Sequence, residues 1–169
     1  MGKHATRVVR WRCVPRGKGG FVFRGIAQLN LDNKGRLAVP ARYRDTLIER
    51  CAGHLVTTAD ADRCVLIYPL PDWETIQQKL EGYSNLDPRV RELQRRLIGF
   101  AVDVEMDSAG RVLIAPALRE FAQLEKRIVL VGQGKKFELW NKDNWEQLIE
   151  RSGGFGAAGL PPELEGFSL

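Results

Sequence analysis

Two short segments of the chain carry the same arrangement of a carboxylate, a glycine and an arginine. The first is Asp32-Asn33-Lys34-Gly35-Arg36 and the second is Asp107-Ser108-Ala109-Gly110-Arg111. In each segment the aspartate can accept hydrogen bonds from the backbone N–H groups ahead of it, and the glycine can adopt the positive φ of a tight turn. The arginine follows at the start of a strand, where its planar set of donors can reach a phosphate or a guanine edge.

The same pattern has a purely structural interpretation. The aspartates would close the turns, and Arg36 and Arg111 would pair with carboxylates. Exposed ion pairs contribute only about 0–1 kcal/mol, so stability alone gives little reason for such a pair. The spacing by itself favours neither interpretation over the other.

Residue patterns of enzymes and metal sites are missing from the sequence. It has no Gly-x-Ser-x-Gly and no His-Glu-x-x-His, and residues 132–136 lack the spacing and the Ser/Thr of a phosphate-binding loop. Asp60 and Asp62 lie in an expected turn, where solvated aspartates are commoner than an acid–base pair. The three cysteines form no Cys-x-x-Cys, and two isolated histidines are too few for zinc. We therefore predict a non-enzyme with no cofactor, metal or small-molecule substrate.

The two turn segments lie within a longer repeat. Residues 31–41 recur as 106–117, with the Asp, Gly and Arg offset by 75 residues, and residues 66–68 correspond to 138–140. Alternating apolar residues around the turn, followed by a proline, predict a β-hairpin and then a short helix in each copy. A second hairpin completes each unit. The predicted strands are 25–31, 36–39, 55–58, 65–68, 128–131 and 136–140, and the short helices are 41–50 and 117–124.

Further helices are predicted between the two copies and after the second. Asp72 is the predicted N-cap of a helix that ends near Glu81, Asp87-Pro88 opens the next helix, and the last helix covers about 143–151. The helix after Asp87 is expected to bury one stripe of apolar residues at helical spacing. This stripe consists of Val90, Leu93, Leu97 and Phe100.

The net charge of +5 is distributed unevenly along the chain. Residues 1–21 contain six basic residues and no acid, whereas the rest of the chain contains 20 basic and 21 acidic residues. Within that part, residues 24–50 hold six bases and three acids, and residues 103–125 hold two bases and five acids. A polyanion is therefore expected to bind the first turn segment, and Arg111 is expected to matter mainly for turn structure.

Both ends of the sequence differ from the repeats in composition. Residues 1–21, which end in Gly17-Lys18-Gly19-Gly20, are interpreted as a basic arm for nucleic acid, as an extension without a role, or as upstream of a true start at Val22, because GTG can serve as a bacterial start codon. Residues 152–169 are rich in glycine and proline. No apolar segment is long enough to span a membrane, so no membrane partner is expected.

Five segments carry the pattern of a known family. They are Phe23-Arg24-Gly25, Asn30-Leu31-Asp32-Asn33-Lys34-Gly35-Arg36-Leu37-Ala38-Val39-Pro40-Ala41-Arg42-Tyr43-Arg44, Tyr68-Pro69-Leu70-Pro71-Asp72-Trp73-Glu74, Gly110-Arg111-Val112-Leu113-Ile114-Ala115-Pro116 and Lys136-Phe137-Glu138-Leu139-Trp140. On these segments the sequence resembles the MraZ family, in order and with both repeats, from residue 23 to about 150. The family begins with Met-Phe-Arg-Gly, which aligns with Val22 and the three residues after it.

The resemblance implies an α+β fold. It consists of tandem AbrB-type swapped-hairpin units that pair about a pseudo-two-fold axis into a double-split β-barrel with linker helices, and several chains close into a ring-shaped homo-oligomer. The resulting divisions are a basic extension (1–21), a first SpoVT-AbrB-type domain (22–74), linker helices (75–101), a second such domain (102–146) and the end of the last helix with its tail (147–169).

The resemblance also implies a function. The family's members are cytoplasmic, nucleoid-associated transcriptional regulators that bind direct repeats in double-stranded DNA upstream of the cell-division and cell-wall gene cluster, and repress an operon that includes their own gene. The family's Asp-x-x-x-Arg signature falls on Asp32–Arg36 and Asp107–Arg111, with Gly35 and Gly110 in the turns. Its DNA-contacting arginine corresponds to Arg36. Local charge adds Lys34, Arg24, Arg42 and Arg44 to the expected DNA-binding residues.

Two other function classes stay open at this point. AbrB-type units also serve as antitoxins, which wrap a toxin with a flexible tail, although antitoxins usually carry one unit and a long tail. A ring scaffold that does not bind DNA is the other alternative, because the chain beyond residue 21 is nearly neutral.

Overall fold

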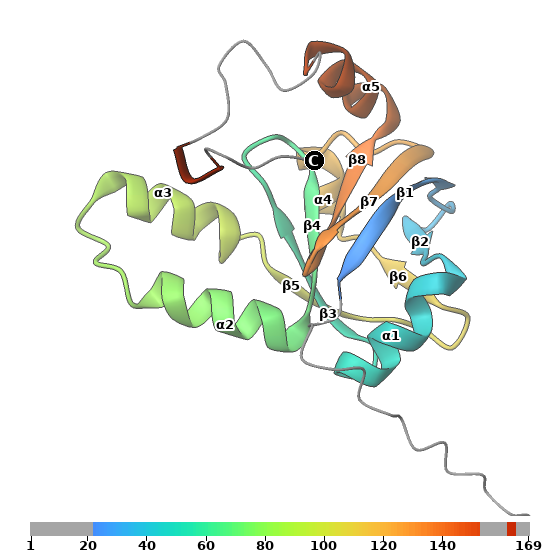
Figure 1. Cartoon of the computed structure of the whole chain (residues 1–169), viewed down its shortest axis with the longest axis horizontal. Coiled ribbons are helices and arrows are strands. Elements are labelled where there is room, and N and C mark those ends of the chain that lie inside the picture. The colour runs from blue at the N-terminus through green and yellow to red at the C-terminus, as the bar shows by residue number, and fades with distance from the viewer. Residues whose placement is uncertain (1–21, 153–161, 165–169) are drawn as a thin grey trace, which may run out of the picture.

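The structure, a computed structural model, describes residues 22–152 and 162–164 as an α+β protein with a mainly antiparallel sheet (Figure 1). The strands are β1 (Phe23–Asn30), β2 (Arg36–Ala38), β3 (His54–Ala59), β4 (Val65–Pro69), β5 (Val102–Glu105), β6 (Arg111–Leu113), β7 (Arg127–Gly134) and β8 (Lys136–Asn141). The helices are α1 (Ala41–Cys51), α2 (Leu70–Glu81), α3 (Pro88–Leu97), α4 (Pro116–Phe121) and α5 (Lys142–Arg151), with a 3-10 turn at Pro162–Leu164. The predicted extension 1–21 and most of the tail lie outside the described residues.

The two repeats exchange their first strands. Six strands form one sheet in the order β1-β7-β8-β4-β3-β5, and β2 pairs with β6 in a separate two-stranded ribbon. Strand β1 of the first repeat pairs along its whole length with β7 of the second, while β5 of the second repeat pairs with β3 of the first. All of these pairings are antiparallel. Among the described residues no pairing joins β1 to β5, so no closed barrel is seen.

The alternation of apolar residues predicts a local hairpin of strands 25–31 and 36–39, and this prediction is wrong. The two strands meet only at the isolated bridge between Leu31 and Leu37, beside the turn. Their remaining hydrogen-bonding edges are used by β7 and β6 instead. The predicted second hairpins are confirmed, because β3 pairs with β4 and β7 pairs with β8.

The core is shared by both repeats. Leu37 and Val112 lie opposite one another in the ribbon, and both are fully buried. They belong to one apolar cluster with Leu55 of the first repeat and Leu130 of the second. Because burying a leucine or valine side chain contributes about 1.5–3 kcal/mol, this packing fixes the ribbon against both repeats.

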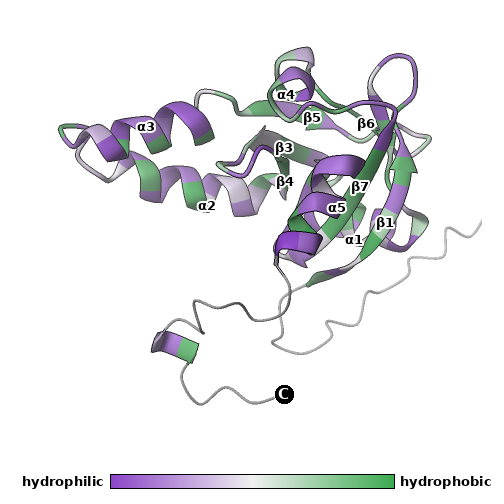
Figure 2. Cartoon of the chain, turned by 90° about the horizontal axis from the view of Figure 1, so that it is seen from above, coloured by the Kyte–Doolittle hydropathy of each residue, from purple (hydrophilic) through white to green (hydrophobic). Residues whose placement is uncertain are grey.

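Helices α2 and α3 lie side by side and extend away from the sheet (Figures 1 and 2). The predicted N-cap of α3 is confirmed, because Asp87 Oδ1 accepts a hydrogen bond from the Arg89 N–H at 2.8 Å. The predicted N-cap of α2 is wrong. That helix begins at Leu70, and Asp72 in its first turn instead pairs with Arg50 at 2.5 Å.

The expectation that α3 buries an apolar stripe is wrong for the single chain. No residue of α3 is buried, and the Leu93 side chain is 39% exposed. Leu97 packs against a small cluster that includes Leu66 and Trp140, while Leu86 before the helix is 82% exposed. A partly covered apolar face of this kind is typical of surfaces that contact another protein.

Candidate nucleic-acid interface

The first Asp-Gly-Arg turn is held by the Asp32 carboxylate. Its Oδ1 accepts hydrogen bonds from the backbone N–H groups of Lys34 and Arg36, each at 2.9 Å, and its Oδ2 accepts one from Arg36 Nε at 2.7 Å. The Gly35 N–H donates to the Asp32 carbonyl at 2.9 Å, and Gly35 has a φ of +78°. Since a positive φ is costly for other residues, the glycine is required by this turn.

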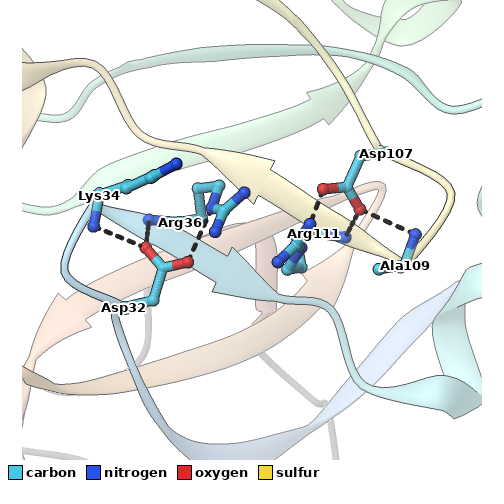
Figure 3. A network of polar contacts seen from close by, with 6 residues as sticks. All are labelled: Asp32, Lys34, Arg36, Asp107, Ala109 and Arg111. Atoms are coloured by element: carbon cyan, nitrogen blue, oxygen red, sulfur yellow. Dashed lines mark hydrogen bonds and ion pairs between the residues drawn. The ribbon is translucent and has the colours of Figure 1, made fainter.

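The second turn repeats this geometry almost atom for atom. Asp107 Oδ1 accepts hydrogen bonds from the N–H groups of Ala109 and Arg111 at 3.0 and 2.8 Å, and Oδ2 accepts one from Arg111 Nε at 2.9 Å. Gly110 has a φ of +74°. Figure 3 shows the two turns at opposite ends of the β2–β6 ribbon.

The ribbon presents both arginines on one face. Arg36 lies opposite Leu113, and Arg111 lies opposite Ala38. Because side chains alternate along a strand, these four residues share the outward face, opposite to the buried Leu37–Val112 pair. In both arginines Nε is bound by the aspartate. No bond to their Nη1 or Nη2 groups occurs within the described part of the chain, so these groups are available to a ligand.

The turn geometry lowers the pKa of both aspartates below the ordinary value of 3.8. For Asp32 the largest cause is the hydrogen bond from the Arg36 backbone N–H, and the Arg36 side chain adds to it. For Asp107 the largest cause is the hydrogen bond from the Arg111 backbone N–H. Each carboxylate is therefore ionised at neutral pH and holds its arginine in place.

These shifts predict a specific loss of stability in acid. A group whose folded pKa is depressed stabilises the fold fully above its unfolded pKa, here 3.8, and stops doing so as pH falls through the lower folded value. We expect the urea midpoint of the wild type to fall more steeply below pH 3.8 than that of a variant carrying Asp32→Asn and Asp107→Asn. Parallel pH curves for the two proteins would contradict this assignment.

The structure separates the basic residues that sequence places together in 24–50. Lys34 is exposed in the first turn, close to Arg36. Arg24 lies near the start of β1, about 20 Å along the strand from Asn30, given about 3.4 Å per residue. Arg42 joins Arg24 rather than the turn, since its guanidinium lies over the ring of Tyr43, which donates a hydrogen bond to the Arg24 carbonyl.

Arg44 lies against the second turn rather than the first. Its Nε donates to the Val39 carbonyl at 2.7 Å, and a Cβ added to Gly110 would lie only 2.3 Å from that Nε.

The first turn has an equivalent residue, Arg119, which sequence reasoning missed. Its Nε donates to the Ile114 carbonyl at 3.1 Å, and its guanidinium lies on Gly35 of the first turn. The 75-residue repeat offset applied to Arg44 would have found it.

The two turns resemble one another in the exposure of their arginines, and the expectation that Arg111 matters mainly for turn structure stays a prediction. The side chains of Arg36 and Arg111 are 27% and 38% exposed, so both are accessible on the ribbon. The acidic residues of 103–125 still surround Arg111 more closely in sequence than Arg36. We therefore treat Arg111 as a second candidate contact and expect a smaller contribution from it than from Arg36.

The described residues also bear on metal binding and on membrane insertion. No group of three or more His, Cys, Asp or Glu side chains in that part of the chain could hold a metal ion. None of the helices among the described residues is both long and apolar enough to cross a membrane.

The fold and the site together define an α+β protein of two strand-exchanged repeats that display matched Asp–Arg turns on one ribbon. The profile of one protein family, described as "MraZ protein, putative antitoxin-like", matches the chain twice, over residues 22–96 and 97–156. The chain belongs to the MraZ family. The predicted resemblance and the two repeats are thereby confirmed.

Relatives with high identity cover nearly all of the chain. A protein of Nitrosospira multiformis is 59% identical over 148 residues, and one of Nitrosomonas eutropha is 55% identical over 148 residues. A protein of Pseudomonas aeruginosa is 51% identical over 153 residues. Each alignment covers 88% of this chain and 100% of the relative, and each relative is named "Transcriptional regulator MraZ".

Proposed function

We propose that this chain is a sequence-specific, DNA-binding transcriptional regulator and not an enzyme. The observation that carries the proposal is the outward face of the β2–β6 ribbon, where two guanidiniums are held at Nε by aspartates and keep their Nη groups unpaired among the described residues. The names of the relatives support regulation of transcription.

The ribbon suits the dimensions of DNA. The major groove admits a two-stranded β-ribbon, and arginine donates two hydrogen bonds to the O6 and N7 atoms of guanine. In this proposal Arg36 reads a base edge, while Lys34 in the same turn contacts phosphate. Arg24 and Arg42 form a separate group about 20 Å along β1, and they would reach only backbone flanking the site.

The finer features of the proposal follow the family resemblance. The ribbon and the exchanged sheet together would form the double-split barrel, with domains at 22–74 and 102–146 joined by the helices of 75–101. Several chains would close into a ring that binds direct repeats upstream of the cell-division and cell-wall gene cluster, including the chain's own operon. The protein would act as a repressor in the cytoplasm, at the nucleoid.

A protein-interaction role is the second candidate, and the partly exposed apolar face of α3 favours it. The family description contains the term antitoxin-like, and Leu93 and Leu86 are open to a partner in the single chain. This role predicts binding to another protein without sequence-specific binding to DNA.

A mobility-shift assay on the DNA upstream of the chain's own coding sequence tests the proposal. We expect a retarded complex that the same DNA displaces and that scrambled DNA of equal length does not. The affinity should fall between about 50 and 200 mM salt, because phosphate contacts release counterions. Equal displacement by scrambled DNA would refute sequence specificity. If no complex forms even at low salt, DNA binding is refuted and the protein-interaction role is the remaining candidate.

A further inference from the structure

Each turn on the ribbon carries a guanidinium from the opposite repeat. Arg119 comes from α4 of the second repeat and lies on Gly35 of the first turn, where an added Cβ would meet its Cζ at 2.6 Å. Arg44 comes from α1 of the first repeat and lies on Gly110 of the second turn. The exchange of strands therefore also exchanges the arginines that accompany the two turns.

Arg119 is held in a fixed position without an ion pair in the described part of the chain. Its Nε is anchored to the Ile114 carbonyl at 3.1 Å, and its guanidinium packs on the Gly35 backbone. No ion pair to Arg119 occurs among the described residues, so its Nη groups have no acidic partner there. The residue is half-buried, which limits the side-chain entropy that a bound anion would have to remove.

The surroundings of Arg119 are open to a ligand of phosphate size. A groove of about 260 Å³ beside the first turn is lined by Arg119, Asn33 and Lys126, together with Asp32 and Glu125. The Asp32 carboxylate in this groove is already paired with Arg36. This groove therefore presents two cations, Arg119 and Lys126, and Glu125 is its one carboxylate outside the turn. Glu120 and Asp143 line a second groove that Arg119 also borders.

We infer that Arg119 is a phosphate-contacting residue of the first turn, supplied by the second repeat, and that Arg44 has the same role at the second turn. The inference rests on the proposed DNA-binding function. Arg36 lies on the ribbon strand itself, whereas Arg119 comes from α4 and lies beside the turn on Gly35. We therefore assign Arg119 to the DNA backbone, which positions the protein, and Arg36 to a base edge. Each DNA-binding unit then consists of one turn and the arginine that the opposite repeat places on it.

The test compares Arg119→Ala with Arg36→Ala in mobility-shift titrations at several salt concentrations. Arg119→Ala should weaken binding to operator and scrambled DNA by the same factor, on the order of tenfold at low salt. It should also lower the slope of log affinity against log salt by about 0.9 for each phosphate that the variant no longer neutralises. Arg36→Ala should instead reduce the ratio of operator to scrambled binding. A purely structural role of Arg119 would not change the salt slope.

Control variants separate charge from folding. Arg119→Lys keeps the cation and should retain most of the salt slope. Arg151→Ala removes an exposed arginine at the end of α5 and should leave binding unchanged. If Arg119→Ala fails to fold by thermal melting, Arg44→Ala provides the same comparison at the second turn. A folded Arg119→Ala protein with wild-type slope and affinity, beside a defective Arg36→Ala protein, would overturn this inference alone. A wild type that binds no DNA would refute the proposed function itself.

Discussion

Replacing Arg36 with alanine is expected to abolish specific DNA binding while the fold and the assembly survive. One bidentate arginine–base contact contributes about 1–3 kcal/mol of discrimination, or about 5- to 150-fold. Several subunits on adjacent sites would multiply this loss. The fold should be little affected, because the pair with Asp32 is partly exposed and such pairs contribute about 0–1 kcal/mol.

Arg111→Ala is the matched control for this prediction. It removes the same side chain from the same turn geometry, at the other end of the ribbon. We expect a weaker effect on DNA affinity than for Arg36→Ala, because the second turn has the neutral Ala109 where the first has Lys34. Near-wild-type binding by a folded Arg36→Ala protein would eliminate Arg36 as the contact. A larger defect in Arg111→Ala would identify the second turn as the principal one.

The second large effect that we expect is assembly. The mass of the protein in solution should correspond to more than four subunits. The face of α3 around Leu93 remains partly exposed in the single chain, and Tyr83 and Leu86 nearby are 63% and 82% exposed. Two repeats in tandem have non-identical outer faces, and contacts between such faces close into rings or continue as filaments. A ring would hold several ribbons at fixed spacing, which can raise affinity for regularly spaced repeats by 10²- to 10⁴-fold over one repeat, as an order of magnitude.

Light scattering combined with binding to one or several repeats checks this expectation. Leu93→Asp should lower the mass and remove the advantage of several repeats while leaving the monomer folded. Ile149→Asp on α5 makes the same change at a 52% exposed position outside α3, and should not lower the mass if α3 forms the contact. A monomeric or dimeric wild type at micromolar concentration, binding one repeat at full affinity, would rule out the ring.

The sequence predicts the local elements and the turns well, because their signals are local. The Asp-x-x-Gly-Arg spacing predicts a tight turn with an arginine beyond it, and both turns have that geometry. The strand pairs β3–β4 and β7–β8 follow from short apolar runs, and the Asp87 cap follows from a residue type that favours that position.

The partners of β1 and β2 are not encoded locally. Alternation predicts that each is a strand with one buried face, but any strand with a complementary face and a free edge can pair with it. Only the resemblance to a swapped-hairpin family indicated the exchange. The repeat offset identifies Arg119 as the counterpart of Arg44, but its position on Gly35 depends on this exchange, because Gly35 and Arg119 lie in different repeats. Charge counting along the sequence likewise does not reveal that Arg44 lies against the second turn.

The pairing of β1 with β7 has a consequence for synthesis of the protein. Asn30 pairs with Arg127 and Phe23 pairs with Gly134. Strand β1 therefore has no partner until the ribosome has synthesised about a hundred further residues. Contacts of such long sequence separation slow folding, and the ribbon likewise needs β6 from the second half of the chain. A nascent or truncated chain that ends before β6 therefore lacks the complete ribbon that we propose as the DNA-binding face. If the proposed function holds, binding to the operator would require translation of the chain at least through β6.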